Sequence, residues 1–370
     1  MKFIHRLLSA IFAVSLPGAA MLKAGDIQAK IRSVDASVEL RFNTANGSFY
    51  EIQGSINLID WTSVESGIPG NGAEVVRLYS ITAAPTRFFK VSNVSVPSGF
   101  ALIPAGSFTM GNSVAEDDVP DAPPHGVTVS AFYMARNLVT KTEWDTVRTW
   151  AVSNGYSDLA AGSAKAGNHP VQTVSWWDSI KYCNARSQQE GLTPVYTVNG
   201  EVMKTGTTPP TANWSANGYR LPTEAEWEKA ARGGMGGKRF PWGDTISHTQ
   251  ANYFGSSDYG YDLSVVKNYH PAYATGAFPY TSPVGSFAAN GFGLNDMAGN
   301  VWQRCWDWYG AYDTGSPTDP RGVSSGLFRV IRGGSWNDPA PNCRVAVRNA
   351  ADPENADDTF GLRVARGSLR

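Results

Sequence analysis

Thiols are the side chains with the most definite chemical meaning in this chain of 370 residues. The sequence holds three cysteines, Cys183, Cys305 and Cys343. An odd number leaves at least one thiol unpaired, which excludes a disulfide-framework fold and allows one bridge whose partners the sequence does not choose. Two thiolates together would suit monovalent copper, since soft ligands select that ion. A lone cysteine is otherwise a buried structural residue or a reactive thiol, and both alternatives stay open for Cys343.

Other groups that carry chemistry show no catalytic pattern. The histidines are His5, His125, His169, His248 and His270. They lack the spacing of metal ligands. The carboxylates Glu116, Asp117, Asp118 and Asp121 gather in a proline-rich loop, where solvated surface is the simpler interpretation and a metal site is the alternative. The sequence has no phosphate-binding loop, dinucleotide fingerprint, GxSxG elbow or HExxH motif.

Charge is balanced, with 31 Lys and Arg against 32 Asp and Glu. No basic stripe stands out, so the chain lacks the electrostatic footprint of a nucleic-acid-binding protein. Glycine (38), proline (22) and tryptophan (12) are frequent. Glycine and proline fix turns while tryptophan supplies buried area, so this mixture predicts ordered loops around aromatic side chains.

Residues 1–20 have the three parts of a secretory signal peptide. Lys2 and Arg6 give a basic start, residues 7–16 form an apolar stretch, and residues 18–20 are a small-residue cleavage region. A buried first helix is the alternative. The apolar stretch is too short to span a bilayer, and no later segment reaches that length. We therefore expect an exported protein, secreted or periplasmic, without a membrane span.

Residues 27–94 predict a small all-β domain, a sandwich or a meander. Apolar and polar residues alternate in four segments: 37–42, 49–53, 74–79 and 87–91. Asn46 and Gly47 form a hairpin signal, so the first two of these strands should pair with each other. Nothing in this domain suggests chemistry, and a spacer or adhesion module is expected. Residues 95–100 predict a linker.

Three capped helices are predicted in the larger C-terminal segment. Each begins with a hydroxyl residue that an acid follows three positions later: Thr140 with Glu143, Ser175 with Asp178, and Thr223 with Glu226. Helices of ordinary length would then stop at Gly155, Gly191 and Gly233. From about residue 234 to residue 368 only short strands and ordered loops are expected. The predicted fold class is therefore α+β.

Six blocks of this segment match one family in order and spacing. They are residues 103–111, 169–176, 219–234, 240–244, 291–302 and 332–336, with a closing match at 360–363. Each block alone is a weak signal, but six in order are specific. Residues 101–368 thus resemble the formylglycine-generating-enzyme domain, also called the sulfatase-modifying-factor domain. The resemblance implies a variant of the C-type lectin fold with sparse regular secondary structure.

The resemblance also implies an activity, since the family's enzymes oxidise a sulfatase cysteine to formylglycine with oxygen and a copper ion held by two cysteines. That pair lies in the loop after the Gly-Gly-Ser motif, here residues 333–335. Counted forward from the motif, Asp338 takes the place of the first cysteine and Cys343 that of the second. Counted backward from Arg344, the loop is a few residues short and Cys343 replaces an aromatic residue. Under either count the pair is incomplete, which argues against copper.

Calcium is a second cofactor that the resemblance implies, bound by main-chain carbonyls and a few side-chain oxygens. The residues that match the first site are Asn252, Tyr253, Gly276 and Phe278. Those that match the second site are Asp296, Gly299, Val301 and Gln303. Family members carry Asp in place of Gly276 and Glu in place of Gln303, so each site loses a carboxylate, although Asp296 restores one charge. We expect the second site to survive and the first to be weak, with a tight structural turn at residues 296–302 as the alternative.

Three hypotheses for function remain. The first is an oxidoreductase that converts a cysteine of an exported protein to formylglycine, against which the missing cysteine argues. The second is a binding module whose loops, including residues 337–342 and 349–358, meet an exported protein or a glycan. The third is another oxidative or hydrolytic activity in the same cleft. A related branch uses iron held by three histidines, largely from an added helical domain that this sequence lacks. The binding module is favoured, because function depends on the site residues and not on the scaffold.

Overall fold

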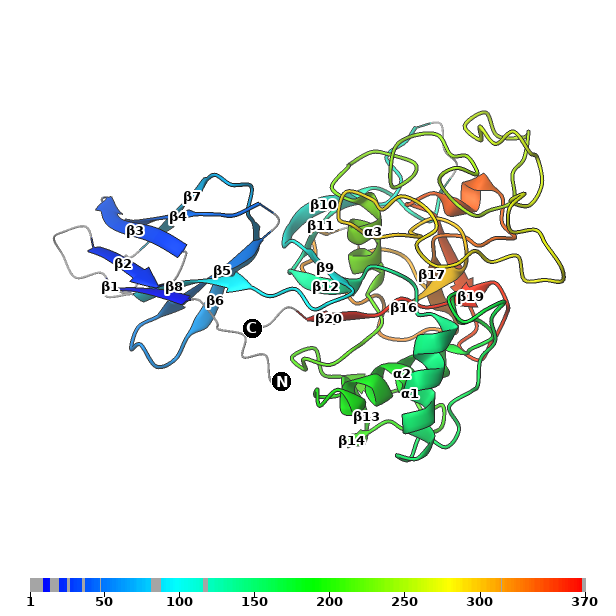
Figure 1. The fold of residues 1–370 in the computed structure, drawn as a ribbon, viewed down its shortest axis with the longest axis horizontal. Coiled ribbons are helices and arrows are strands. Elements are labelled where there is room, and N and C mark those ends of the chain that lie inside the picture. The colour runs from blue at the N-terminus through cyan, green and yellow to red at the C-terminus, as the bar shows by residue number, and fades with distance from the viewer. Residues whose placement is uncertain are drawn as a thin grey trace. The chain divides into compact units, whose positions relative to one another are not determined.

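The computed structural model of the chain describes residues 9–13, 20–24, 27–34, 37–46, 48–80, 88–115, 119–313 and 315–367. The chain divides into two compact units, an N-terminal one that ends at Ser98 and a C-terminal one that begins at Gly99 (Figure 1). Most of the predicted signal peptide lies outside the described residues, as do Gly47 and the carboxylates of Glu116, Asp117 and Asp118.

Two four-stranded sheets make up the N-terminal unit. The first has the order β1-β8-β5-β6, formed by Ser9–Ala13, Phe88–Val94, Phe49–Ser55 and Thr62–Pro69. The second has the order β2-β3-β4-β7, formed by Ala20–Ala24, Ile27–Val34, Ser37–Asn43 and Glu74–Ser80. Leu40 of β4 and Ile52 of β5 lie fully buried in one hydrophobic cluster that both sheets share. The unit is therefore a β-sandwich.

The hairpin predicted at Asn46 and Gly47 is wrong. Strand β4 pairs with β3 and β7, whereas β5 pairs with β6 and β8, so the chain crosses from one sheet to the other between β4 and β5. The alternating pattern misled the prediction. It shows which face of a strand is buried, but it does not show whether two successive strands lie in the same sheet or in the two facing sheets of a sandwich. Phe42 of β4 and Tyr50 of β5 accordingly meet in the core of the sandwich, with their ring centroids 5.6 Å apart.

The start of the chain contains strand and no helix in the residues that the structure describes there. Ser9–Ala13, within the predicted signal peptide, is β1 and pairs antiparallel with β8. This pairing belongs to the uncleaved chain, so cleavage and export stay predictions. At the predicted linker, the first strand of the C-terminal unit already begins at Phe100.

All three predicted helices are confirmed, each with a complete capping box. They are α1 (Lys141–Val152), α2 (Trp176–Gln189) and α3 (Glu224–Arg232). Gly233 ends α3 in the left-handed conformation, with φ of 57°. Helix α1 packs on α2, whereas α3 packs on strands β10, β11, β16 and β17 of the same unit.

Short strands form four small sheets in the C-terminal unit. One pairs β10 (Gly106–Met110) with β11 (His125–Val129). Another joins β20 (Ala365–Gly367), β12 (Phe132–Ala135) and β9 (Phe100–Ile103). A third joins β14 (Glu201–Val202), β13 (Tyr196–Val198) and β15 (Thr211–Ala212). The fourth has the order β18 (Arg348–Ala351), β17 (Arg329–Arg332), β16 (Trp302–Trp308) and β19 (Phe360–Gly361).

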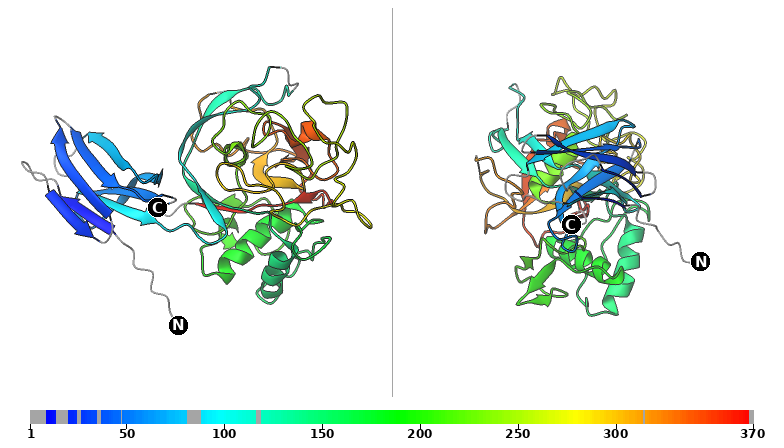
Figure 2. Two further views of the ribbon diagram at one scale, coloured as in Figure 1. Left: turned by 45° about the horizontal axis from the view of Figure 1, so that its top comes forward. Right: turned by 90° about the vertical axis from the view of Figure 1, so that its left-hand side faces the viewer.

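Loops carry the rest of the C-terminal unit. Between α3 and β16 the chain runs through residues 233–301, all described, without a helix or a strand. In the views of Figures 1 and 2 these loops lie on the side of the unit opposite α1 and α2. The expected α+β class with sparse regular structure is confirmed. Within the described ranges, no helix has the length and apolar character that crossing a bilayer requires.

Candidate functional site

Cys343 lies in the loop that follows β17, at the end of a short 3-10 turn over Ala340–Cys343. Its side chain is fully buried and packs in a cluster with Phe240, Tyr253 and Ala298. Gly334 approaches it closely, because a Cβ added there would lie 2.8 Å from the Cys343 sulfur. Burial raises the pKa of the Cys343 thiol well above its usual range, so the sulfur is held as a neutral thiol in an apolar enclosure.

The other two thiols stand elsewhere and pair with nothing. Cys183 lies on α2 and Cys305 on β16, where it belongs to a different core cluster from Cys343. All three cysteines are free and buried. The one bridge that the sequence allowed does not form. A copper ion that requires two thiolates therefore does not fit the residues around Cys343.

Asp338, which takes the place of the first copper-binding cysteine in one alignment, is a structural brace. Its Oδ2 accepts hydrogen bonds from the indole N–H of Trp302 (2.8 Å) and from the hydroxyl of Ser335, and its Oδ1 accepts one from the amide of Asn342 (2.6 Å). The Asp338 carbonyl also accepts from the backbone N–H of Phe254 at 2.9 Å. The carboxylate thus ties the Cys343 loop to β16.

Four aromatic rings, which we call the aromatic platform, cover this loop: Tyr269, Phe278, Tyr280 and Trp336. The ring centroids of Phe278 and Trp336 lie 5.3 Å apart and those of Tyr269 and Tyr280 lie 5.0 Å apart. The Tyr269 hydroxyl donates to the side-chain oxygen of Asn337 at 3.0 Å. Trp336 is 3% exposed but Phe278 is 58% exposed. A buried ring therefore supports an exposed one, which presents a rigid apolar surface beside the site.

An acidic loop adjoins the aromatic platform. The indole N–H of Trp336 donates to the carbonyl oxygen of Asp358 at 3.3 Å, which places this end of residues 352–358 next to the Trp336 ring. That loop carries the carboxylates of Asp352, Glu354, Asp357 and Asp358. Partial burial, followed by the neighbouring charge of Asp357, raises the pKa of Asp358. The platform is thus an apolar surface with a negatively charged border.

At the first of the two calcium positions, one side-chain oxygen lacks a partner. Asn252 donates from Nδ2 to the Tyr280 carbonyl at 2.8 Å, while its Oδ1 is buried without a hydrogen bond. A buried oxygen without a donor fits a cation. The carbonyl of Tyr253, however, already accepts from His248 Nε2 at 3.0 Å, and Gly276 brings no carboxylate. The set keeps one free neutral oxygen and has lost the compensating charge.

A lysine brings its own positive charge to this part of the molecule. The Lys165 ammonium donates to the carbonyl oxygens of Tyr273 (3.0 Å) and Thr275 (2.6 Å), and it lies 5.1 Å from the centroid of the Tyr280 ring. These carbonyls stand just before Gly276 in the chain. The protein thus satisfies carbonyl oxygens of this loop with a side-chain cation.

At the second calcium position, the side-chain amide of Gln303 presents an N–H donor where the carboxylate of a family member's Glu would present an oxygen acceptor. Its Oε1 accepts from Trp227 Nε1 (2.9 Å) and from Arg363 Nε (3.0 Å), both groups that only donate. This pair fixes the amide orientation, so Nε2 donates to the carbonyl oxygen of Asp296 at 2.7 Å. An N–H thus takes the very carbonyl that a calcium ion would need.

Asp296 does not reverse that conclusion. Its Oδ2 accepts from the backbone N–H of Gly285 at 2.7 Å, whereas its buried Oδ1 has no hydrogen-bond partner, and burial raises its pKa. Arg363 approaches the Asp296 carbonyl to 3.4 Å and brings a full positive charge. With the N–H of Gln303 and this guanidinium in place, the residues here do not fit a calcium ion. Each of the two positions keeps one buried side-chain oxygen without a hydrogen-bond partner, Asn252 Oδ1 at the first and Asp296 Oδ1 at the second.

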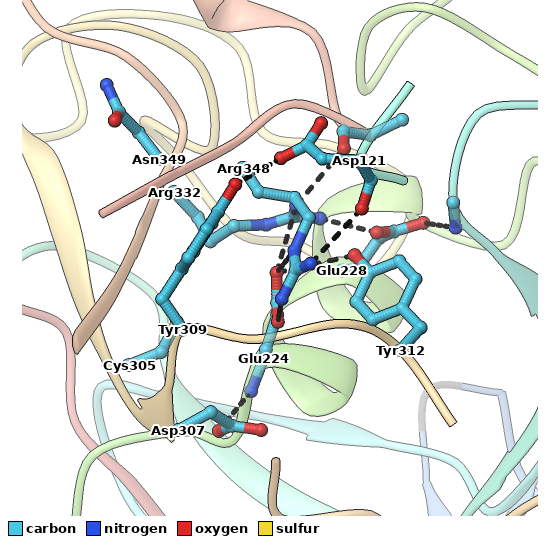
Figure 3. A network of polar contacts seen from close by, with 12 residues as sticks. Asp121, Glu224, Glu228, Cys305, Asp307, Tyr309, Tyr312, Arg332, Arg348 and Asn349 are labelled. Atoms are coloured by element: carbon cyan, nitrogen blue, oxygen red, sulfur yellow. Dashed lines mark hydrogen bonds and ion pairs between the residues drawn. The ribbon is translucent and has the colours of Figure 1, made fainter. Parts of the chain in front are cut away.

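A buried network of ion pairs surrounds α3 on the other side of β17 (Figure 3). Arg348 binds both oxygens of Glu224, each at 2.7 Å. Arg332 bridges Glu224 (3.3 Å) and Glu228, and Arg232 pairs with Glu228 at 2.7 Å. Burial opposes ionisation of Glu228, but Arg232 and Arg332 hold its pKa below the usual value. Every carboxylate oxygen of the two glutamates has a cationic or backbone partner, so the network serves the fold.

A cavity of about 390 Å³ opens beside this network, lined by Glu224, Asp307, Tyr312 and Arg348 among others. Asp307 accepts from the backbone N–H of Glu224 at 2.8 Å and so closes the N-terminal end of α3. Burial, followed by the Glu224 charge, raises the pKa of Asp307 to about 8. Of the predicted acidic cluster only Asp121 is described, and its carboxylate accepts from the hydroxyl of Tyr309 at 2.6 Å.

The sequence did not reveal the aromatic platform. Its rings come from residues 269–280 and from Trp336, which no periodic pattern connects. Phe278 was singled out only for its carbonyl. Gly333 and Gly334 both lie in the left-handed region, with φ of 97° and 74°. Within the described residues, no group of three or more His, Cys, Asp or Glu side chains could hold a metal ion together.

Comparison with known proteins agrees with the motif analysis. Residues 87–368 match the model of the sulfatase-modifying factor enzyme 1-like domain family. The chaperone protein LppX of Paenibacillus barcinonensis is 31% identical over 287 residues, which cover 74% of this chain and 91% of that protein. The formylglycine-generating enzyme of Mus musculus is 31% identical over 318 residues, covering 78% of this chain and 82% of the enzyme.

Solved structures resemble the same part of the chain. The Treponema denticola variable protein 1 aligns with a TM-score of 0.56 and 28% identity, over 72% of this chain and 94% of its own. The structure of PvdO from Pseudomonas aeruginosa aligns with a TM-score of 0.54 and 27% identity, again over 72% and 94%. The alignments cover nearly the whole of both proteins, so the likeness extends over a complete domain and not only over its motifs.

Proposed function

Because this chain belongs to the family of sulfatase-modifying factor enzyme 1-like domains, we propose that it keeps the family scaffold and uses it to bind a partner. The fold is that of the formylglycine-generating enzymes, with α+β architecture. In this proposal the chain is a divergent member that does not use copper and does not oxidise a cysteine. The alternative is the oxidoreductase activity of the formylglycine-generating enzymes, or another oxidative reaction in the same cleft.

One observation carries the proposal: the site offers a single thiol, and that thiol is fully buried. Cys343 is 0% exposed and its pKa is raised by burial, so it is neither a nucleophile nor a ready thiolate ligand. The Asp338 carboxylate accepts three hydrogen bonds from groups within the protein. A copper ion would lack its second sulfur and would have to displace this brace.

The aromatic platform supports binding as the alternative role. Exposed rings on a rigid support lose little conformational entropy when a partner covers them, which is why aromatic residues dominate binding surfaces. Phe278 is the exposed ring, Trp336 supports it, and the Asn337 side chain beside them adds an amide. Asp358, whose carbonyl oxygen accepts from Trp336, adds an acidic residue beside the rings. Such a surface suits a glycan or a protein segment with polar or basic groups around an apolar contact.

Export and a lectin-like role follow from the same proposal. The predicted signal peptide would bring the chain to the periplasm or the medium, where an exported protein or a glycan is the available partner. The family scaffold is expected to be a variant of the C-type lectin fold. The small β-sandwich would act as a spacer, since its strands carry no cluster of chemically active side chains among the described residues.

The test combines a glycan array with a pull-down of exported proteins, each with the purified full-length chain. The ligand found in this way is then titrated against Phe278→Ala and against Leu327→Ala. Leu327 is 80% exposed and lies outside the platform, so it is a matched control for loss of an exposed apolar side chain. We expect Phe278→Ala to weaken binding at least about tenfold and Leu327→Ala to leave it unchanged.

Two outcomes would refute the proposal. If the array and the pull-down yield no specific ligand, the chain is not a binding module of this kind. If a ligand binds Phe278→Ala as tightly as the unmodified chain, the platform is not its site. Equal melting temperatures of both variants would show that neither substitution acts through unfolding.

A further inference from the structure

A second cavity in the C-terminal unit lies between α3 and β10, away from the Cys343 loop. Its volume is about 600 Å³, within the range of small-molecule sites. Residues that matter for its chemistry are Gly106, Phe108, Lys229, Arg232, Met235 and Gly236. No role in the proposed binding surface accounts for this cavity.

Lys229 is the charged group in the cavity whose charge is least compensated. It is 7% exposed, and its ammonium donates to the carbonyl oxygens of Gly106 (2.7 Å) and Val129 (3.4 Å). An ammonium has three N–H donors, so one is left over. The carboxylate that acts on it through charge is Asp319, whose two oxygens already accept from the backbone N–H (2.6 Å) and the hydroxyl (2.7 Å) of Ser130. Burial lowers the pKa of Lys229 to about 8 because its charge is poorly compensated.

Arg232 provides an independent observation in the same cavity wall. Its Nε and Nη2 pair with Glu228, and Nη2 also donates to the Gly111 carbonyl. Its Nη1 is buried and has no hydrogen-bond partner. Arg232, Arg332 and Arg348 share the two carboxylates of Glu224 and Glu228, so the arginines of this network outnumber its glutamates. A buried N–H without a partner costs stability unless a ligand or water supplies an acceptor.

The remaining lining mixes apolar side chains and glycines with the hydroxyl residues Ser107, Thr109 and Ser113. Phe108, Met235 and Phe292 supply hydrophobic surface on the cavity lining. Gly234, Gly236 and Gly237 form a rim, and a Cβ added at Gly236 would have no atom within 4 Å. The cavity therefore combines two cationic groups with unmet hydrogen-bond donors, Lys229 and Arg232, with a lining that is in part apolar.

We propose that this cavity binds a small molecule with one carboxylate and an apolar body, with Lys229 as the residue that receives the carboxylate. The free ammonium N–H of Lys229 and the unpartnered Nη1 of Arg232 can donate to the two oxygens of one carboxylate. A phosphate ester carries more charge and more acceptor oxygens than these groups satisfy. The apolar body lies against Phe108 and Phe292, where its burial contributes to the affinity.

Isothermal titration of the full-length chain with hexanoate and with hexanamide tests this site. The two probes share the same chain and differ in charge. We expect hexanoate to bind and hexanamide to bind at least about tenfold more weakly. Lys229→Met should abolish that preference, while Lys204→Met should keep it. Lys204 is a matched control, because its ammonium also donates to a backbone carbonyl, that of Asn154 at 3.0 Å, and lies over the ring of Tyr156.

A blocking variant guards against an effect of Lys229→Met on folding. Gly236→Phe fills the entrance without backbone strain, since the φ of Gly236 lies outside the left-handed region and its Cβ position is open. We expect this variant to lose hexanoate binding and to keep its melting temperature. Equal binding of hexanoate and hexanamide, no measurable binding of either, or binding that survives Lys229→Met and Gly236→Phe would each overturn the proposal.

Discussion

Two regions of the C-terminal unit differ in how complete their sets of interacting side chains are. Around α3, Glu224 and Glu228 stand one turn apart and meet Arg332 and Arg348 in a network in which each charge has its partner. In the second region, which comprises the Cys343 loop and the segments around Gly276 and Gln303, the resemblance implies one copper-binding cysteine and two calcium carboxylates that this chain lacks. The first region holds the fold together, and the second is where the resemblance implies the metal sites. A match to family motifs such as residues 219–234 therefore reports the scaffold and says little about the reaction.

The difference has a physical cause. A buried charge that loses its partner destabilises the whole domain, so the network must remain complete. A ligand for a metal can be lost without unfolding when a side chain from the protein satisfies the groups that remain. Lys165 donates to the Thr275 carbonyl beside Gly276, and Gln303 donates to the Asp296 carbonyl. Asp338 accepts from the Ser335 hydroxyl in the loop of Cys343.

Breaking the network should have the largest effect. Arg332→Met leaves Glu224 and Glu228 with one cationic partner each, and we expect a loss of about 3–5 kcal/mol in the free energy of unfolding. Urea denaturation measures it. Arg321→Met is the control, since Arg321 is exposed and stacks on Trp214 at 4.4 Å, and should cost less than about 1 kcal/mol. Equal losses in both variants would remove the contrast between the two regions.

Removing the brace in the Cys343 loop should cost less and act locally. Asp338→Ala leaves the donors of Trp302, Ser335 and Asn342 without their acceptor, and a loss of about 1–3 kcal/mol is expected. Asp338→Asn keeps the shape and one acceptor oxygen and should lose less. Hydrogen exchange should rise in residues 336–344 and stay unchanged in α3. A loss as large as that of Arg332→Met would show that the loop is part of the scaffold.

Restoring a carboxylate at the second calcium position should restore a response to calcium. In Gln303→Glu the donor that faces the Asp296 carbonyl becomes an acceptor, which an oxygen-seeking cation can use. The melting temperature of this variant should rise when calcium replaces a chelator, as binding to the folded state requires. The unmodified chain should show no rise from this position. A rise of equal size in both proteins would mean that Gln303 does not exclude the ion.

The smallest expected effect is a difference in hydrogen exchange between the two regions in mild acid. Burial is the main cause that lowers the pKa values of His169, His248 and His270 below 6.5, so the unfolded state binds more protons there. Their contribution to stability is present above pH 6.5 and is lost as the pH falls through the lower folded values. Glu228, with its pKa below 4.5, loses its contribution only in stronger acid. Exchange at pH about 5.5 should therefore rise in residues 245–285 before it rises in α3.

Features that depend on residues close in sequence could be predicted, whereas those that depend on distant segments could not. Local signals were sufficient for the helices, because Thr140, Ser175 and Thr223 cap their own first turns. The pairing of β4 with β7 was not, since the alternation in residues 37–42 fixes which face is buried and leaves the neighbouring strand open.

The candidate site was predictable only where its residues are close in sequence. That the loop around Cys343 holds a single cysteine was evident from the sequence. The aromatic platform was not, because Tyr269 and Trp336 meet through loops without periodicity. The amide direction of Gln303 depends on Trp227 and Arg363, which come from two distant segments, so its conflict with calcium could not be seen in the motif.

Oxidation of a cysteine peptide tests the central claim most directly. The purified chain is incubated with copper(I), oxygen and a peptide that contains Cys-x-Pro-x-Arg, and the peptide is then weighed by mass spectrometry. An authentic formylglycine-generating enzyme in a parallel reaction shows that the conditions support turnover. A sealed single thiol predicts a peptide of unchanged mass and a protein that retains no copper after dialysis. A peptide lighter by the difference between cysteine and formylglycine, together with stoichiometric copper on Cys343, would contradict the account.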